Sequence, residues 1–407
     1  MKIGIIRETK VPEDNRVALI PKQVKQIQNL YPDIEIQVQA SPTRAFSDEE
    51  YMSEGITVLE DVSDCDILLG IKEANIDSII PGKHYIFFGH IAKCQAYNKP
   101  LLLSMLDKGI TFTDWEYLVD DNNQRLIAFG WYAGVVGVYY TLRGWGLKTG
   151  KFSLPKPDKH FSREHIIALL KDVDLSGLSI LVTGSGRVSH GAQYILESIG
   201  ARKLSVEEYL HSWNNNDLIY TVANKQDLVS TIDCNCMFDS EEFISHPERY
   251  KSNFGRFAKH TDILLSCHFW GQNQPVYLTR EIMQTPECRI KMVGDITCDI
   301  DGSIKSTVRS STHAQPYYDY NPLTGKEEVA FSNPENISVM AVDTCPNALP
   351  RETSEFFGAK FIDEILPSLI ADSENSVIID RASIVKRGKI NTPFKYLEDY
   401  VNSDINH

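Results

Sequence analysis

The sequence predicts an α/β protein with two Rossmann-like domains, in which parallel sheets are flanked by helices. Two observations carry this prediction. Short apolar runs alternate with segments of helical spacing, and one apolar run leads directly into a glycine turn and a helix near residue 184. A chain of 407 residues is also longer than one hydrophobic core usually serves, so we expect two domains.

The first domain is expected to begin with a buried strand at residues 2–6, followed by a charged loop and a helix from Pro21. Further apolar runs predict strands at 34–40, 66–72, 84–91 and 110–118, and leucine-rich spacing predicts a helix at 99–109. Strands separated by helical patterns in this way indicate a parallel sheet.

An apolar, aromatic segment at 128–146 has the length of a helix, and the polar stretch 148–165 after it marks a domain boundary. We interpret the segment as an interdomain helix, with an oligomer contact as the alternative. The second domain opens with a strand, glycine turn and helix at 178–201, and later strands of its sheet are expected within 259–272 and 290–304. Residues 351–370 have apolar spacing of three and four and predict a helix near the chain end.

Composition and charge disfavour several classes of protein. Hydrophobic residues make up 42% of the chain and charged residues 24%, which excludes wholesale disorder. A net charge of −14 disfavours binding to nucleic acid or to an anionic membrane. No apolar window of membrane-spanning length, no signal-peptide pattern and eight scattered cysteines together predict a cytoplasmic protein. Cys234 and Cys236 form a lone CxC pair, so no metal site is expected.

The glycine turn has the context of a dinucleotide site. Gly184 permits the tight turn, Gly186 lets the backbone approach a pyrophosphate, and the helix N-terminus stabilises its charge. The pattern is GxGxxS, because Ser189 stands where a third glycine is usual. The predicted cofactor-binding residues of this domain are Gly184, Ser185, Gly186, Arg187, Val188, Glu207 and Asp295.

The choice between NAD and NADP depends on the residue that contacts the adenosine ribose, which is expected about 20 positions after the glycines. Glu207 or Glu208 fits this spacing and favours NAD, since a carboxylate repels a 2′-phosphate. A solvated helix start is the alternative interpretation of these two residues. Asp295 follows an apolar strand and is expected at the same sheet edge.

Ionisable residues of the first domain stand at predicted strand ends, which form the active edge of a parallel sheet. Lys72 and His90 are the candidate acid–base pair, against the alternatives of a surface lysine and a core histidine. Glu73, Lys93 and Gln95 stand near the same strand ends, Arg16 follows the first strand and its loop, and Glu116 and Arg125 precede an apolar element. Arg125 has two candidate partners, Glu116 and a substrate carboxylate.

The run KIGIIRETKVPEDNRVALIP resembles the opening of the alanine dehydrogenase and transhydrogenase superfamily. The blocks GIKE, FFGHIAKCQAYN, DWEYLVDDNNQRLIAFGWYAGVVG, VTGSGRVSHGAQ and LPRETSEFF are more similar to its saccharopine-forming branch, the lysine-forming saccharopine dehydrogenases and lysine-ketoglutarate reductases. The resemblance runs almost end to end and covers one catalytic unit.

The resemblance implies a discontinuous substrate domain of residues 1–133 plus 346–407, and a dinucleotide-binding domain of residues 134–345. It further implies an active-site cleft between them, where NAD or NADP meets lysine and 2-oxoglutarate or their product saccharopine. In this reading Lys72 and His90 exchange protons with the substrate, and Glu73 lies close to the reacting atoms. The resemblance implies that the substrate is surrounded by Arg16, Lys93, Gln95, Glu116 and Arg125. The protein is then a monomer or homo-oligomer. Two alternatives remain open: an amino-acid dehydrogenase like alanine dehydrogenase, and a nucleotide-binding module without catalysis.

Overall fold

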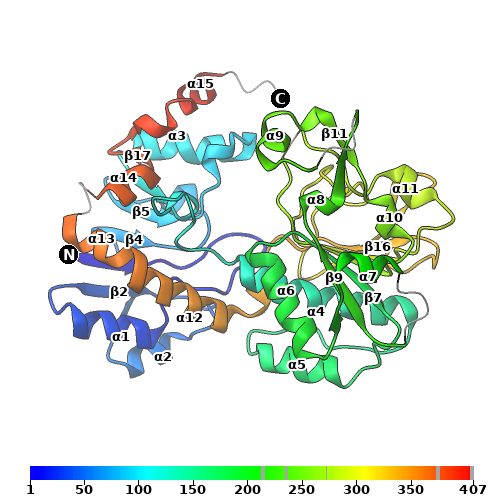
Figure 1. Cartoon of the computed structure of the whole chain (residues 1–407). Helices are drawn as coiled ribbons and strands as arrows, with labels where there is room; N and C mark the ends of the chain where they lie inside the picture. Colours follow the sequence, from blue (N-terminus) through cyan, green and yellow to red (C-terminus); the bar gives the residue numbers. More distant parts are fainter. Residues whose placement is uncertain (212–215, 234–236, 272, 373–375, 404–407) are drawn as a thin grey trace. The chain divides into compact units, whose positions relative to one another are not determined.

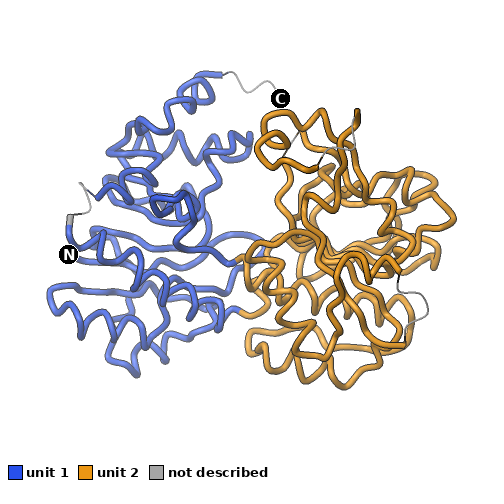
Figure 2. Tube along the Cα trace, in the orientation of Figure 1, with its two compact units in different colours: residues 1–129, 350–407 blue, residues 130–349 orange. Residues whose placement is uncertain are grey.

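The computed structural model describes residues 1–211, 216–233, 237–271, 273–372 and 376–403. Cys234 and Cys236 lie outside the described residues. The chain divides into two compact units, one of residues 1–129 and 350–407 and the other of residues 130–349 (Figure 2). The junctions thus follow residues 129 and 349, where the sequence analysis placed them after residues 133 and 345.

Unit 1 is built around an eight-stranded sheet in the order β18-β17-β6-β5-β4-β1-β2-β3 (Figure 1). Strands β1 to β6 are parallel, whereas β17 and β18 join the edge beside β6 in antiparallel fashion. The strands are β1 (Lys2–Ile5), β2 (Glu35–Gln39), β3 (Thr57–Leu59), β4 (Ile67–Leu69), β5 (His84–Phe87), β6 (Thr111–Asp114), β17 (Ser383–Lys386) and β18 (Lys389–Ile390).

The helices of unit 1 flank this sheet (Figure 1). They are α1 (Pro21–Leu30), α2 (Asp48–Ser53), α3 (Lys99–Asp107), α12 (Pro350–Lys360), α13 (Leu366–Asp372), α14 (Val377–Ala382) and α15 (Leu397–Asn402), with a π-helical turn at Phe361–Ile365 between α12 and α13. The central strands are buried on both faces, which explains their continuous apolar sequences. The C-terminal segment completes the core of unit 1, where Phe357 stacks on Phe129 with ring centroids 4.8 Å apart.

Unit 2 has a second eight-stranded sheet, in the order β15-β14-β16-β13-β12-β7-β9-β8. Its parallel part is extended by the antiparallel pair β14 and β15. The strands are β7 (Ser179–Thr183), β8 (Arg202–Lys203), β9 (Ile219–Ala223), β12 (Ile263–Ser266), β13 (Met292–Asp295), β14 (Tyr317–Asn321), β15 (Lys326–Glu328) and β16 (Ile337–Met340). A separate antiparallel pair consists of β10 (Val229–Thr231) and β11 (Tyr250–Ser252).

The helices of unit 2 are α4 (Gly130–Thr149), α5 (Arg163–Lys171), α6 (Arg187–Ser198), α7 (Val206–His211), α8 (Lys225–Leu228), α9 (Ser240–Ser245), α10 (Gly255–Ala258) and α11 (Arg280–Gln284). Glycines let α4 and α6 touch backbone to backbone. A Cβ placed at Gly134 would lie 1.9 Å from the oxygen of Val188, and one placed at Gly191 would lie 1.9 Å from the oxygen of Trp131. Gly134 therefore serves packing against α6 within unit 2, whereas Gly137 and Gly144 face Ile296 and Tyr317 of the same unit.

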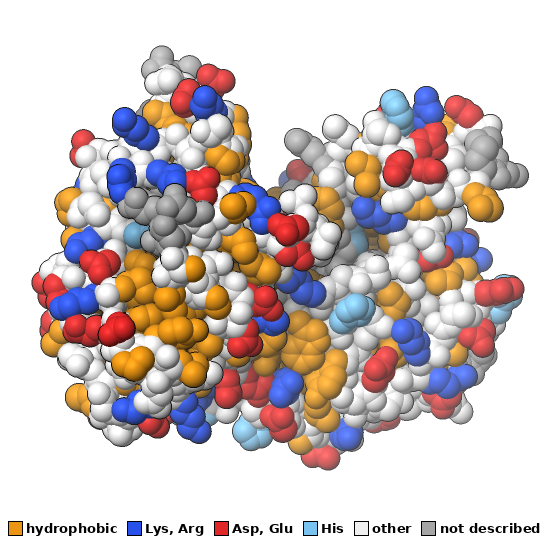
Figure 3. All heavy atoms as spheres, turned by 60° about the vertical axis from the view of Figure 1, so that its left-hand side comes forward, with side chains coloured by type: hydrophobic (Ala, Val, Ile, Leu, Met, Phe, Trp, Pro, Cys, Tyr) orange, Lys and Arg blue, Asp and Glu red, His pale blue; other side chains and the backbone are white. Residues whose placement is uncertain are grey.

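The prediction of an α/β fold with two parallel sheets flanked by helices is confirmed. No helix in the described ranges has the length and apolar character needed to cross a membrane. On the face shown in Figure 3, Lys and Arg side chains are interspersed with Asp and Glu side chains.

Candidate functional site

The carboxyl ends of the parallel strands in unit 1 carry most of the predicted site residues. Strand β1 lies between β4 and β2, so the chain order reverses at β1, which is where parallel α/β sheets place their ligands. Lys72 and Glu73 follow β4, His90 follows β5, and Glu116 follows β6. The structure thus brings these residues to one edge of one sheet.

Glu73 connects the candidate histidine to a lysine. Its Oε1 lies 3.1 Å from Nδ1 of His90, and its Oε2 accepts a hydrogen bond of 2.7 Å from Nζ of Lys10. Burial of Glu73 opposes ionisation, but the hydrogen bonds from His90 and Lys10 outweigh it and lower the pKa of Glu73 to about 2. Glu73 is therefore a carboxylate at neutral pH and orients the imidazole through Nδ1, which leaves Nε2 for a reacting group.

His90 is held in an uncommon backbone conformation, with φ at +52°. The side-chain amide of Asn98 donates a hydrogen bond of 3.2 Å to the His90 carbonyl. Strained residues of this kind cluster at functional sites, where the surroundings over-determine their geometry.

The ammonium group of Lys72 is mostly buried, and within the described ranges it forms no hydrogen bond or ion pair. Burial lowers the pKa of Lys72, and the charge of Arg16 lowers it further, while Glu73 and Asp14 oppose the change. A lysine with a lowered pKa and no hydrogen bond or ion pair among the described residues is suited to donate and accept a proton.

Two buried carboxyl groups that sequence analysis missed hold the backbone on either side of these residues. Glu8 accepts hydrogen bonds from the N–H groups of Ile71 and Lys72, at 2.6 and 2.9 Å. Burial and the nearby charge of Asp14 raise the pKa of Glu8 to about 8.

Asp114, the last residue of β6, likewise binds backbone N–H groups after neighbouring strands. It accepts hydrogen bonds from the N–H groups of Gly89 and Glu116, at 3.0 and 2.9 Å, and so ties the loop before His90 to the loop after β6. Burial raises the pKa of Asp114 to about 6. Nothing in the local sequence marks either carboxyl as buried, because the burial comes from backbone of distant strands.

Arg16 is buried and paired. Its Nε and Nη2 donate hydrogen bonds of 2.9 and 2.5 Å to the two oxygens of Asp14, and its guanidinium carbon lies 4.3 Å from the ring centroid of Phe129. Salt bridging to Arg16 outweighs the burial of Asp14 and lowers the pKa of that carboxyl.

The remaining predicted substrate residues form a more open group. Nη2 of Arg125 lies 2.5 Å from Oε1 of Glu116, and Nζ of Lys93 lies 3.6 Å from the same oxygen. Both cations are close to half exposed, at 43% and 48% of their side-chain surface. The side chain of Gln95 is exposed, and its carbonyl accepts a hydrogen bond of 2.6 Å from Tyr400.

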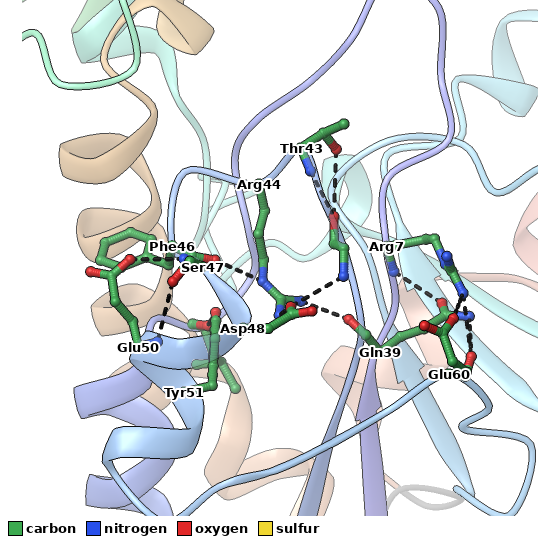
Figure 4. Close-up of polar contacts among 12 residues, drawn as sticks. Arg7, Gln39, Thr43, Arg44, Phe46, Ser47, Asp48, Glu50, Tyr51 and Glu60 are labelled. Carbon is green, nitrogen blue, oxygen red and sulfur yellow. Dashed lines mark hydrogen bonds and ion pairs between the residues drawn. The ribbon is translucent and has the colours of Figure 1, made fainter.

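A second polar network in unit 1 is structural. Figure 4 shows Arg44 directed at Asp48 and at carbonyl oxygens, where its Nε donates to Phe46 at 2.8 Å and its Nη1 donates to Gln39 at 2.7 Å. The guanidinium lies over the ring of Tyr51. Arg44 therefore fixes the connection between β2 and α2 and has no donor directed at a ligand in this network.

The glycine turn of unit 2 has the shape that a pyrophosphate needs. Gly184 has φ at +86°, and a Cβ there would lie 2.7 Å from Cα of His268. A Cβ at Gly186 would meet nothing within 4 Å, so the space above the turn is open. Gly186 is the N-cap of α6 and has no side chain to cap the first turn, which suits an anionic ligand at this helix end. These residues fit a dinucleotide.

Asp295 lies at the end of β13 and is buried and fully engaged. Its Oδ1 accepts hydrogen bonds from N and Oγ1 of Thr297, and its Oδ2 accepts one of 2.6 Å from Oγ1 of Thr307. Burial raises the pKa of Asp295. These hydrogen bonds hold the loop after β13 to the Asp295 carboxyl group.

Glu207 lies away from the strand next to the glycine turn. It is an exposed residue of α7, which follows the edge strand β8. The strand that pairs with β7 is β9, and Asn224 and Lys225 follow it directly. Within the described part of the chain, no group of three or more His, Cys, Asp or Glu side chains could hold a metal ion.

Comparison with known proteins finds a family match in the first part of the chain. Residues 4–136 match the family described as alanine dehydrogenase/PNT, N-terminal domain. The matched segment includes Lys72, Glu73, His90 and Glu116, and it extends into the first residues of α4.

Curated relatives match over nearly the whole chain. Alpha-aminoadipic semialdehyde synthase of Arabidopsis thaliana is 30% identical over 438 aligned positions, which cover 97% of this chain and 41% of that protein. The chain therefore spans less than half the length of this relative. A saccharopine dehydrogenase (NAD⁺, L-lysine-forming) of Candida glabrata is 28% identical, with 89% of each chain covered.

Solved structures show the same fold at low identity. An L-alanine dehydrogenase has a TM-score of 0.65 and 15% identity, with 98% of this chain and all of that chain covered. A transhydrogenase from Sinorhizobium meliloti has a TM-score of 0.59 and 14% identity, with 96% of this chain and all of that chain covered. The chain thus has the fold of alanine dehydrogenase.

Proposed function

We propose that this protein is an NAD(P)-dependent oxidoreductase that forms or cleaves saccharopine. In the forming direction it joins L-lysine and 2-oxoglutarate with oxidation of NADH or NADPH. One observation carries the proposal: a lysine-forming saccharopine dehydrogenase aligns with 89% of this chain. The edge of unit 1 that gathers Lys72, Glu73 and His90 supports it. We assign substrate binding to unit 1 and nucleotide binding to unit 2, through the turn at Gly184.

The chemistry requires proton transfers at two atoms of the substrate. The ε-amine of lysine attacks the ketone carbon of 2-oxoglutarate, and the ketone oxygen leaves as water after it takes up protons. The coenzyme supplies the hydride that reduces the resulting imine carbon. His90, held at Nδ1 by Glu73, and Lys72, with its lowered pKa, are the groups that exchange these protons.

We assign binding of the substrate carboxylates to the cations at the same edge of the unit 1 sheet. Saccharopine has three carboxylates, while the protein has a net charge of −14, so positive charge must be concentrated locally. Arg125 and Lys93 are exposed enough to exchange their contact with Glu116 for a substrate carboxylate. Arg16, with two nitrogens bound to Asp14, contributes charge from a fixed position. The cysteines among the described residues are free thiols, which supports a reducing compartment such as the cytoplasm.

The test is an absorbance assay of NADH or NADPH oxidation by the full chain. The substrate combinations are lysine with 2-oxoglutarate, ammonia with 2-oxoglutarate, and ammonia with pyruvate. We expect oxidation only with lysine and 2-oxoglutarate. Oxidation with ammonia and pyruvate alone would assign an alanine dehydrogenase activity instead, and no oxidation in any combination would refute the proposal.

A further inference from the structure

We propose that Lys225 and Arg256 bind the 2′-phosphate of NADP(H), so that unit 2 prefers NADP(H) to NAD(H). This inference rests on the proposed function for the requirement of a nicotinamide coenzyme. It names which of the two coenzymes the site takes, and it reverses the preference that Glu207 suggested from spacing alone.

The order of strands decides which residue faces the adenosine ribose. In doubly wound sheets that residue stands at the carboxyl end of the strand beside the glycine strand. Here β9 pairs with β7 over its full length, with Thr183 opposite Ala223, and the N–H of Gly184 donates a hydrogen bond of 2.8 Å to the oxygen of Ala223. Strand β8 pairs with β9 alone. The ribose position therefore falls at residues 224 and 225, one strand inward from Glu207.

Lys225 offers a cation at this position. It is partly buried, and no carboxylate among the described residues forms an ion pair with it; its Nζ lies 5.5 Å from the ring centroid of Phe243. Its charge reaches the glycine turn, since burial and then the charge of Lys225 lower the pKa of His268 to about 3. His268 is the residue whose Cα lies beneath Gly184.

Arg256 adds a second cation at the same loop. Its Nη2 donates a hydrogen bond of 2.9 Å to the oxygen of Asp227, in the same short helix as Lys225. Its Nε is buried and, within the described ranges, has no acceptor. A guanidinium bonded to the helix that contains Lys225 brings a second positive charge to this loop, and this charge matches a phosphate group.

The carboxylate of Asp227, in the same loop, is hydrogen-bonded to the backbone. Oδ2 of Asp227 accepts a hydrogen bond of 2.9 Å from the N–H of Asn224. The ribose position thus offers two cations against one carboxylate that is directed into its own turn. An NAD-specific site instead presents a carboxylate to the ribose hydroxyls, and that carboxylate would repel a 2′-phosphate.

The test measures binding to the full chain by calorimetry, with adenosine 2′,5′-bisphosphate and adenosine 5′-monophosphate as probes. We expect the bisphosphate to bind at least tenfold more tightly. Lys225→Glu and the milder Lys225→Gln should each remove most of this ratio, and Arg256→Gln should reduce it. Lys259→Glu, at an exposed lysine after α10, makes the same charge change as Lys225→Glu and should leave the ratio intact.

Equal binding of the two probes by the unmodified protein would overturn the proposal, and so would an unchanged ratio in a folded Lys225→Gln variant. If Glu207→Ala lowers the affinity for adenosine 5′-monophosphate and the bisphosphate binds no more tightly than the monophosphate, the ribose contact would be assigned to α7. The probes need no amino-acid substrate, so failure of the saccharopine assay with tight bisphosphate binding would refute the proposed reaction and leave this assignment standing.

Discussion

The contact between α4 and α6 makes Gly191→Ala a sharp test of the packing in unit 2. An added Cβ would lie 1.9 Å from the backbone oxygen of Trp131, whereas ordinary contact needs roughly 3.4 Å, so the helices must separate by about 1.5 Å. Overpacking of this kind costs about 3 kcal/mol. Alanine in a helix gains about 1 kcal/mol over glycine, so a net loss of about 2 kcal/mol is expected.

Thermal unfolding of the full chain measures this loss. For a unit of this size, about 2 kcal/mol corresponds to a fall in Tm of about 4–8 °C. Gly186→Ala is the matched control, because its Cβ meets nothing within 4 Å, and we expect less than about 1 kcal/mol there. Nucleotide affinity should fall in the control, since we propose that the pyrophosphate binds at the turn that contains Gly186. A Tm of Gly191→Ala equal to or above that of the unmodified protein would refute the close approach of the two helices.

Three further predictions concern the edge of unit 1. Lys72→Met and His90→Ala should each lower kcat by about 10²-fold without a matching fall in Tm, and near-normal turnover in both would remove them from the acid–base role. Burial raises the pKa of Glu8 from 4.5 to about 8, so the folded state binds the proton more tightly than the unfolded state does, and stability falls as the pH rises from 4.5 to about 8. The Tm measured over this pH range should therefore decline less in Glu8→Gln than in the unmodified protein. Equal slopes of Tm against pH would contradict the burial of this carboxyl. Arg125→Gln should raise the KM for 2-oxoglutarate about tenfold. Its Tm should change little, because an exposed ion pair contributes less than about 1 kcal/mol to the free energy of unfolding. A large fall in Tm with an unchanged KM would show that the ion pair with Glu116 is structural.

Most of the parallel strands could be predicted from sequence because strands buried on both faces are continuous apolar runs, although the sequence analysis did not identify β9 and β16. The edge strands could not. Strand β17 comes from the far end of the chain to pair with β6, and a local pattern holds no information about that pairing. Strand β8 is only Arg202–Lys203 and exposed, and a count of about 20 residues from the glycines leads to α7 after it, whereas the strand beside β7 is β9. The apolar run at Ile219–Ala223 was the available signal for the true neighbour.

The candidate site shows a similar division. Strand ends identify Lys72, Glu73, His90 and Glu116 from sequence, since ionisable residues that follow apolar runs collect at one sheet edge. The carboxyls of Glu8 and Asp114 could not be recognised, because their partners are backbone N–H groups of other strands. Hydrogen bonds to backbone leave no trace in the identity of the partner residue.

The charges around Lys72 lead to a last prediction, about how its pKa changes when substrate binds. In the free protein, burial and Arg16 lower that pKa against the opposing charges of Glu73 and Asp14. A bound dicarboxylate adds negative charge at the same edge, and this favours the protonated amine. The limb of the pH profile that belongs to Lys72 should therefore lie at lower pH in kcat/KM, which reports the free protein, than in kcat, which reports the complex.

Profiles measured in the saccharopine-forming direction test this displacement. Lys72→Met should lose the displaced limb from the residual activity, whereas a limb that comes from the amine of the lysine substrate persists in the variant. An identical limb in the unmodified protein and in Lys72→Met would show that another group titrates, and would transfer the proton exchange to His90 alone. Because Glu73 is already ionised, with a pKa of about 2, its charge is constant over the measured range and adds no limb of its own.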